Sequence, residues 1–160
     1  MKTLIIYASK TGTTEKCAGI LGQNLKNSTI INLATIQNES IDKYDLIIIG
    51  SPIRMGMIDK RVKKFISKNF NSLQNKKVCY FICCGFNENW KQYYEQNFTK
   101  ELLDNAIIYD TFGGEMSLEQ QKGFDKFIVK MVNKSMNDNK EIKILDENIN
   151  KFIEKVKEVM

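Results

Sequence analysis

Residues 3–21 read TLIIYASKTGTTEKCAGIL, and they join an apolar run, a hydroxyl-rich loop and a helical pattern. The apolar run Thr3–Ala8 is short and continuous, which is typical of a strand buried on both faces of a sheet. After the loop, Thr14, Cys17 and Leu21 recur at three- and four-residue steps and predict a helix with one buried face. Strand, loop and helix in this order form the start of a βαβ unit, which predicts an α/β fold.

The rest of the chain repeats this alternation. Further strand candidates are Thr29–Leu33, Asp45–Gly50, Lys77–Cys83 and Ala106–Thr111. Apolar residues follow a helical period in three more stretches, namely Ile58, Val62, Phe65, Ile66 and Phe70; Trp90, Tyr94, Phe98 and Leu102; and Ile149, Phe152, Ile153, Val156 and Met160. Right-handed crossovers between such strands give a doubly wound sheet. The sequence therefore predicts one domain over residues 1–160, with five parallel strands in the order 2-1-3-4-5.

Two segments depart from this alternation. Asn38–Tyr44 is short and weakly periodic, so a full helix is not expected before the third strand. Gly113–Ile144 is an inserted segment between the fifth strand and the last helix, with a helical stretch at Leu118–Met136. Its lysines recur every four residues and would form one row on a helix: Lys122, Lys126, Lys130 and Lys134. Such a row suits peripheral contact with an anionic membrane, and the alternative is the solvated side of a packed helix.

The composition excludes several classes of function. The chain has 160 residues and a net charge of +5. It contains no histidine, so acid–base catalysis by histidine is excluded. Its four cysteines lack the spacing of a zinc site or a CxxC redox motif, so no metal site is expected. The positive charge is modest and no nucleic-acid-binding module is found, so a lysine-rich solvated surface is expected. The apolar run at the N-terminus is too short for a signal peptide or a membrane span, which predicts a cytoplasmic location.

The loop after the first strand is rich in hydroxyls. It consists of Ser9, Lys10, Thr11, Gly12, Thr13 and Thr14, and a helix follows directly. Backbone N–H groups at a helix N-terminus bind phosphate, hydroxyls add donors, and Gly12 allows tight curvature. An ordinary helix cap is the alternative, although four hydroxyls exceed what one cap uses. The loop contains neither GxxxxGK[ST] nor GxGxxG, so it predicts a phosphate site of another kind.

The whole stretch Ile5–Leu21 resembles the FMN signature of flavodoxins. The aliphatic pair, the aromatic Tyr7, the hydroxyl-bearing loop and the later Ala18 all occur at the family spacing. This resemblance implies a flavodoxin-like form of the doubly wound fold, with FMN as the cofactor. It also implies that Ser9–Thr14 wraps the FMN phosphate.

Two further loops follow the third and fourth predicted strands. In flavodoxins, the loops at these positions flank the isoalloxazine ring. The resemblance implies a ring site formed by Ser51, Pro52, Ile53, Arg54, Met55, Gly56, Cys84, Gly85, Phe86 and Trp90. Trp90 is alternatively a core residue on a helix face. The peptide at Gly56 either turns toward the reduced ring or only forms the turn.

A second resemblance concerns Tyr44–Gly56, which reads YDLIIIGSPIRMG. This block, together with Phe124–Met131 in the inserted segment, is similar to the flavodoxin-type, quinone-dependent protoporphyrinogen oxidases. The resemblance implies an oxidoreductase whose FMN takes electrons from a porphyrinogen and passes them to a quinone. The alternative is a soluble flavodoxin-type carrier of single electrons between redox proteins. A flavin-free domain on the same fold is a third hypothesis.

Overall fold

The computed structural model describes residues 1–36, 39–85, 87–115 and 142–160, and its strands form a six-stranded sheet. The strands are β1 (Thr3–Tyr7), β2 (Ser28–Asn32), β3 (Leu46–Arg54), β4 (Met57–Ile58), β5 (Lys77–Cys83) and β6 (Ala106–Thr111). Five of them are parallel in the order β2-β1-β3-β5-β6, and the short β4 pairs antiparallel with β3. The predicted fold class and the predicted order of the five parallel strands are confirmed.

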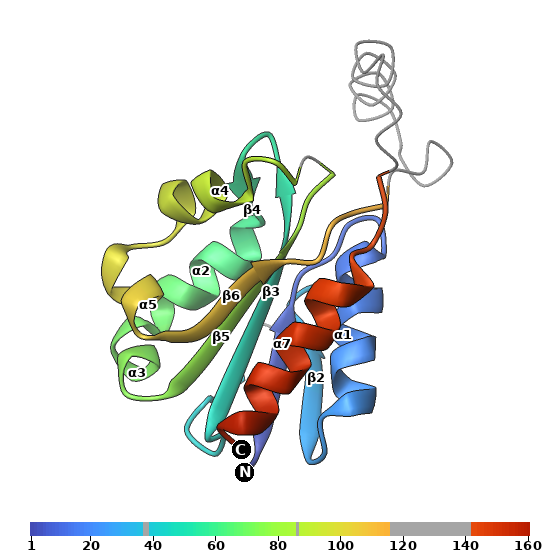
Figure 1. The fold of residues 1–160 in the computed structure, drawn as a ribbon. Coiled ribbons are helices and arrows are strands. Elements are labelled where there is room, and N and C mark those ends of the chain that lie inside the picture. Colours follow the sequence, from blue (N-terminus) through green and yellow to red (C-terminus); the bar gives the residue numbers. More distant parts are fainter. Residues whose placement is uncertain (37–38, 86, 116–141) are drawn as a thin grey trace, which may run out of the picture.

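Helices cover both faces of this sheet (Figure 1). One face carries α1 (Thr13–Asn24) and α7 (Asp146–Glu158). The other face carries α2 (Lys60–Lys68), α3 (Phe70–Gln74), α4 (Trp90–Asn97) and α5 (Lys100–Asp104). The carboxyl ends of the parallel strands therefore lie at one edge between two helical layers, where ligands of doubly wound folds bind.

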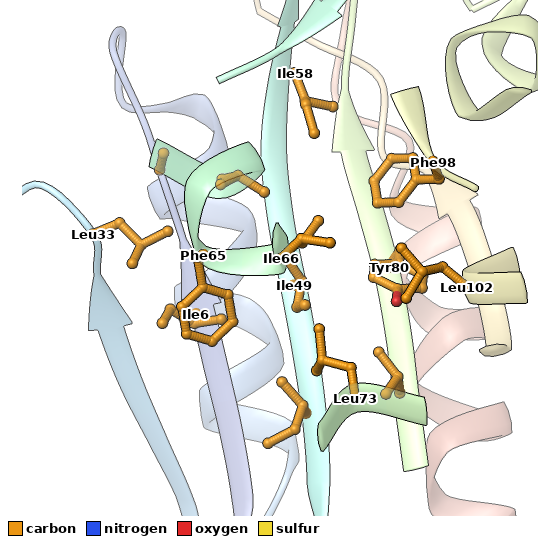
Figure 2. Close-up of a cluster of buried hydrophobic side chains, with 14 of the residues drawn as sticks. Ile6, Leu33, Ile49, Ile58, Phe65, Ile66, Leu73, Tyr80, Phe98 and Leu102 are labelled. Atoms are coloured by element: carbon orange, nitrogen blue, oxygen red, sulfur yellow. The ribbon is translucent and has the colours of Figure 1, made fainter. Parts of the chain in front are cut away.

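The continuous apolar strands are explained by these two layers. In β1, Ile6 packs in the core that contains Phe65 of α2, and Figure 2 shows this cluster. The neighbouring Ile5 points the opposite way and packs in the core that contains Leu21 of α1 and Phe152 of α7. Because successive strand residues face opposite sides, a strand covered on both sides must be apolar throughout.

The third strand corrects the sequence prediction. β3 continues beyond Gly50 as far as Arg54 and folds back into β4, a strand that the sequence analysis did not predict. Ile58 belongs to β4, although its spacing had placed it on the following helix. That helix begins only after Asp59, whose side chain caps it by accepting a hydrogen bond from the Arg61 backbone N–H. The helical spacing of apolar residues began too early, at Ile58, because Ile58 reaches the same core from β4 as it would from the helix.

The stripe of aromatic residues after β5 is also divided. Phe98 and Thr99 are extended, so α4 ends before them and α5 starts after them. The extended backbone places the centroid of the Phe98 ring 4.9 Å from the centroid of the Tyr80 ring, and Leu102 belongs to the same core (Figure 2). Tyr94, Phe98 and Leu102 are buried and Trp90 is partly buried, but the prediction of one continuous helix is wrong.

The inserted segment enters and leaves the fold at one place. Gly113 and Ile144 form an antiparallel bridge, and the Leu145 backbone N–H donates to the Phe112 carbonyl at 2.9 Å. The predicted helix at Leu118–Met136, its lysine row and the Phe124–Met131 block lie outside the described residues. No helix is present among the described residues between β2 and β3, as the weak period of that segment indicated.

Candidate functional site

Three loops follow β1, β3 and β5 at the carboxyl edge of the sheet, where β1 lies between β2 and β3 and the strand order reverses. The first of them holds the predicted phosphate site. Gly12 has a φ of +92° and is the residue before α1, and a Cβ built on it would meet no atom within 4 Å. Its N–H donates to Ser9 Oγ at 3.1 Å, and this bond closes the loop. Gly12 therefore adopts a left-handed conformation, which suits the tight curvature expected of this loop.

The hydroxyls of Thr13 and Thr14 distinguish a ligand site from an ordinary cap. Both residues are buried, with 6% and 1% of their surface exposed. Neither Oγ1 atom makes a hydrogen bond of ordinary geometry within the described structure, although the Thr14 hydroxyl interacts with the Cys83 thiol, and no side chain caps the start of α1. Buried hydroxyls are normally paired, because an unpaired one loses its bonds to water without replacement. Two unpaired hydroxyls at a helix N-terminus thus fit a phosphate group as their missing acceptor.

The first part of the second loop is already engaged within the protein. Ser51 is buried, and its hydroxyl donates to the Pro52 carbonyl at 2.9 Å. The same oxygen accepts the backbone N–H of Asp59 at 2.9 Å. Pro52 is in register with Cys83 of β5, so these predicted ring residues lie within the sheet. Their described contacts are structural, and their contact with a flavin ring remains a prediction.

The tip of this second loop is a strained two-residue turn. Met55 and Gly56 have φ values of +50° and +78°, and Arg54 pairs with Met57 across the turn. Positive φ at both central residues is typical of the type I′ hairpin turn, which favours glycine or asparagine. Met55 instead adopts this conformation with 85% of its surface exposed. A strained, exposed and apolar tip is more typical of a binding element than of a simple turn.

Asn97 of α4 holds this tip in place. Its Nδ2 donates to the Gly56 carbonyl and to the Tyr93 carbonyl, both at 2.8 Å. Its Oδ1 accepts the Ile58 backbone N–H at 3.1 Å. Asn97 was not among the predicted site residues, because no local pattern links an α4 residue to a hairpin about forty residues earlier in the chain.

The third loop is anchored by the chain where the inserted segment begins. The Cys84 backbone N–H donates to the Gly113 carbonyl at 2.8 Å, and Gly114 lies against Cys84 and Gly85. Phe86 lies outside the described residues. Trp90 packs edge-on against Tyr94 and Tyr109, with ring centroids 5.8 and 6.3 Å apart. Trp90 is thus partly buried against the core, and its stacking on a flavin ring remains a prediction.

The sequence of the chain matches the model of a known protein family. A model described as "Flavodoxin domain" matches residues 4–143. The chain belongs to the flavodoxin domain family. An uncharacterized protein of Methanocaldococcus jannaschii is 37% identical over 105 residues, a match that covers 65% of each chain. Protoporphyrinogen IX dehydrogenase (quinone) of Escherichia coli strain K12 is 23% identical over 148 residues, which are 84% of this chain and 80% of that protein.

Solved structures support the same fold for this flavodoxin-domain protein. A flavoprotein from Lactobacillus acidophilus, crystallised in complex with FMN, superposes with a TM-score of 0.53 at 24% identity. That superposition covers 69% of this chain and 92% of the other. This superposition supports the same overall fold for the two chains.

The cysteines of this flavodoxin-domain protein are buried thiols. Cys17 of α1 and Cys83 of β5 lie with their sulfur atoms 3.8 Å apart, directly behind the phosphate loop. The hydrogen bond with Cys17 and burial raise the pKa of the Cys83 thiol well above its ordinary value, while the nearby Thr14 hydroxyl acts in the opposite direction. The Cys83 thiol is therefore neutral near pH 7, and both buried cysteines serve as small core side chains. No cluster of three potential metal ligands occurs among the described residues, and none of the described helices is long and apolar enough to span a membrane.

Proposed function

We propose that this protein binds FMN and transfers electrons through it. The observation that carries the proposal is the pair of buried, unpaired hydroxyls at Thr13 and Thr14, behind a loop curved by Gly12. A terminal phosphate supplies the acceptor that both hydroxyls lack, and the α1 N-terminus stabilises its charge. FMN, when bound, supplies the electron-transfer chemistry. The family and the FMN complex of a structural neighbour support the same cofactor.

Within this proposal, the residues divide into two groups. Ser9–Thr14 would hold the phosphate, with Gly12 giving the backbone its curvature. The second and third loops would flank the ring: Ile53 and the exposed Met55 offer apolar surface, and Cys84–Gly85 offers backbone groups. An apolar slot excludes water from the ring, while backbone groups bind its polar edge.

For the reaction, we infer oxidation of a porphyrinogen with a quinone as the electron acceptor. The support is the similarity of Tyr44–Gly56 to the quinone-dependent oxidases and the relative in Escherichia coli that spans most of the chain. A soluble electron carrier between redox proteins is the second candidate, and the match to the flavodoxin domain family is compatible with it. A cytoplasmic location and membrane contact through the lysine row remain predictions.

The proposal is tested on the purified protein. We expect a yellow protein that releases FMN on denaturation, identified by chromatography against FMN, FAD and riboflavin. Anaerobic addition of protoporphyrinogen should then remove the absorbance of the oxidised flavin, and a soluble naphthoquinone should restore it. A protein that takes up no FMN would refute the cofactor. A flavin that is reduced by a reduced ferredoxin but not by porphyrinogen would favour the carrier.

A separate prediction concerns Gly56 at the tip of the hairpin. Alanine at its φ of +78° is strained, so Gly56→Ala should restrict the peptide that the reduced flavin would meet. We expect a change in the separation between the two one-electron potentials of bound FMN, measured by spectroelectrochemistry. Gly19→Ala is the matched control, because Gly19 lies within α1 with no atom near its missing Cβ. If this separation were the same in wild type and Gly56→Ala, Gly56 would serve only to form the turn.

A further inference from the structure

An ion pair at the start of α2 contacts the phosphate loop. Arg61 binds Asp59 through two hydrogen bonds, Nε to Oδ1 at 2.8 Å and the terminal nitrogen to Oδ2 at 2.7 Å. The same terminal nitrogen of Arg61 reaches the Ser9 carbonyl at 3.5 Å. Residues 52 positions apart in the chain are thereby joined, and neither Asp59 nor Arg61 was predicted from the sequence as part of the site.

The position of this pair is fixed by the backbone. Asp59 Oδ1 accepts the Arg61 backbone N–H at 2.9 Å, and the Asp59 backbone N–H donates to Ser51 Oγ at 2.9 Å. Both side chains are largely covered, with 34% of Arg61 and 16% of Asp59 exposed. Such a two-pronged pair, held at the N-terminus of a helix, keeps its charges in one place, unlike a surface lysine.

The contact with Ser9 also orients the loop. All described peptide bonds are trans, so the C=O of Ser9 and the N–H of Lys10 point in opposite directions. With the Ser9 carbonyl directed at the Arg61 guanidinium, the Lys10 N–H points away from that guanidinium. Arg61 therefore contacts the loop in two ways: its guanidinium lies at the outer limit of hydrogen-bonding distance from the Ser9 carbonyl, and it places a positive charge beside that peptide.

The carboxylate beside Arg61 acts against this charge. Hydrogen bonds from Arg61 lower the pKa of Asp59 below its ordinary value, and the nearby Lys10 contributes in the same direction. Asp59 is therefore ionised near neutral pH. A phosphate dianion in the loop would be attracted by Arg61 and repelled by Asp59, and the balance of the two would tune the affinity.

We propose that Arg61 is a positioning and specificity residue for the terminal phosphate of the flavin nucleotide, and that Asp59 limits the affinity by offsetting its charge. The inference rests on the proposed FMN function and deepens it. It assigns the selection of the phosphorylated flavin over riboflavin in part to a side chain outside the hydroxyl-rich loop. The charge at this position acts from α2 and the hydroxyls act from α1, so the two contributions are separable by substitution.

The test uses the full chain, freed of flavin and titrated with FMN and with riboflavin by flavin fluorescence. Arg61→Met should weaken FMN binding about tenfold, because one partly covered charge is lost beside the dianion. Asp59→Asn keeps a good helix cap but removes the opposing charge, and it should strengthen FMN binding several-fold. Riboflavin carries no phosphate, so neither substitution should change its affinity by more than about twofold, within the ordinary scatter of surface substitutions.

Four controls separate charge from structure. Lys64→Met removes the same unit charge one turn further along α2, where Lys64 is exposed, and it should leave the affinity for FMN nearly unchanged. Melting curves of the variants establish that each is folded, and Arg61→Lys supplies a second variant that retains the charge. The difference between wild type and Arg61→Met should also shrink as salt is added, because salt screens charges at a partly exposed site.

The outcomes are distinct. Opposite effects of Arg61→Met and Asp59→Asn on FMN, with riboflavin unaffected, would support the proposal. Weaker binding of FMN in both variants, or equal losses for FMN and riboflavin, would show that the pair only supports the fold and would overturn it. A wild-type protein that binds no FMN overturns the proposed function itself, and with it this inference.

Discussion

Thr13→Asp is expected to abolish FMN binding while leaving the protein folded. Thr13 is buried at the first position of α1, and its hydroxyl has no partner within the described structure. A carboxylate there would face the phosphate dianion at close range, which should weaken FMN binding by about a hundredfold or more. The positive end of the helix dipole stabilises the same carboxylate, and this offsets part of the stability lost by placing a charge at a buried position. Binding is measured by quenching of flavin fluorescence, and folding by circular dichroism.

Thr13→Val is the matched control for this substitution. It removes the hydroxyl, retains the branched shape and adds no charge, so we expect a loss of about tenfold, the size of one hydrogen bond. Riboflavin binding should survive in both variants, since the repulsion requires a phosphate. If Thr13→Asp bound FMN as tightly as wild type, the loop would be a helix cap and the proposed phosphate site would be wrong.

Gly50→Ala is expected to destabilise the fold strongly. Gly50 lies in β3, and a Cβ at this position would overlap the ring of Phe81 in β5. That ring cannot move aside easily, because it stacks on Phe112 with centroids 4.7 Å apart and contacts Phe152 edge-on. Overpacking of this kind costs about 1–3 kcal/mol, and a position between fixed rings belongs at the upper end. The loss is measured as the free energy of unfolding in urea.

A second substitution tests the cause of this loss. Phe81→Leu shortens the side chain that a Cβ at Gly50 would meet, so the double variant should be more stable than the sum of the two single losses implies. Additive losses would show that the Phe81 ring is not the obstacle. Any shift of Gly50 would reach the phosphate loop, because the Ala8 backbone N–H donates to the Gly50 carbonyl at 3.2 Å. Reduced FMN binding in Gly50→Ala is therefore expected alongside the reduced stability.

The parts of this fold that follow from local pattern were predictable. The parallel strands are continuous apolar runs because they are covered on both faces, and the hydroxyl-rich loop carries its pattern within six residues. The division between α4 and α5 was not predictable, because Phe98 keeps its place in the helical stripe while its backbone is extended. The β3–β4 hairpin escaped prediction for a similar reason, since Ile58 reaches the same core from a strand as it would from a helix.

The candidate site shows the same limit. Its first loop is contiguous in sequence, so its residues could be named in advance. Asn97 and Arg61 act through contacts with Gly56 and Ser9, which are far from them in the chain. Single-sequence patterns carry no information on such pairings, because they depend on how separate elements pack.

The bridge between Gly113 and Ile144 has a consequence for variation of chain length. The two residues meet directly, and the backbone around them is fixed by bonds from Gly114 N–H to the Lys143 carbonyl and from Leu145 N–H to the Phe112 carbonyl. The two ends of the inserted segment are therefore held at the sheet in the same way, whatever the number of residues between them. Because the entropy of closing a loop rises only slowly with its length, insertions and deletions at this point cost little folding free energy. This junction is a place where homologous chains can gain or lose whole segments while the flavodoxin sheet stays unchanged.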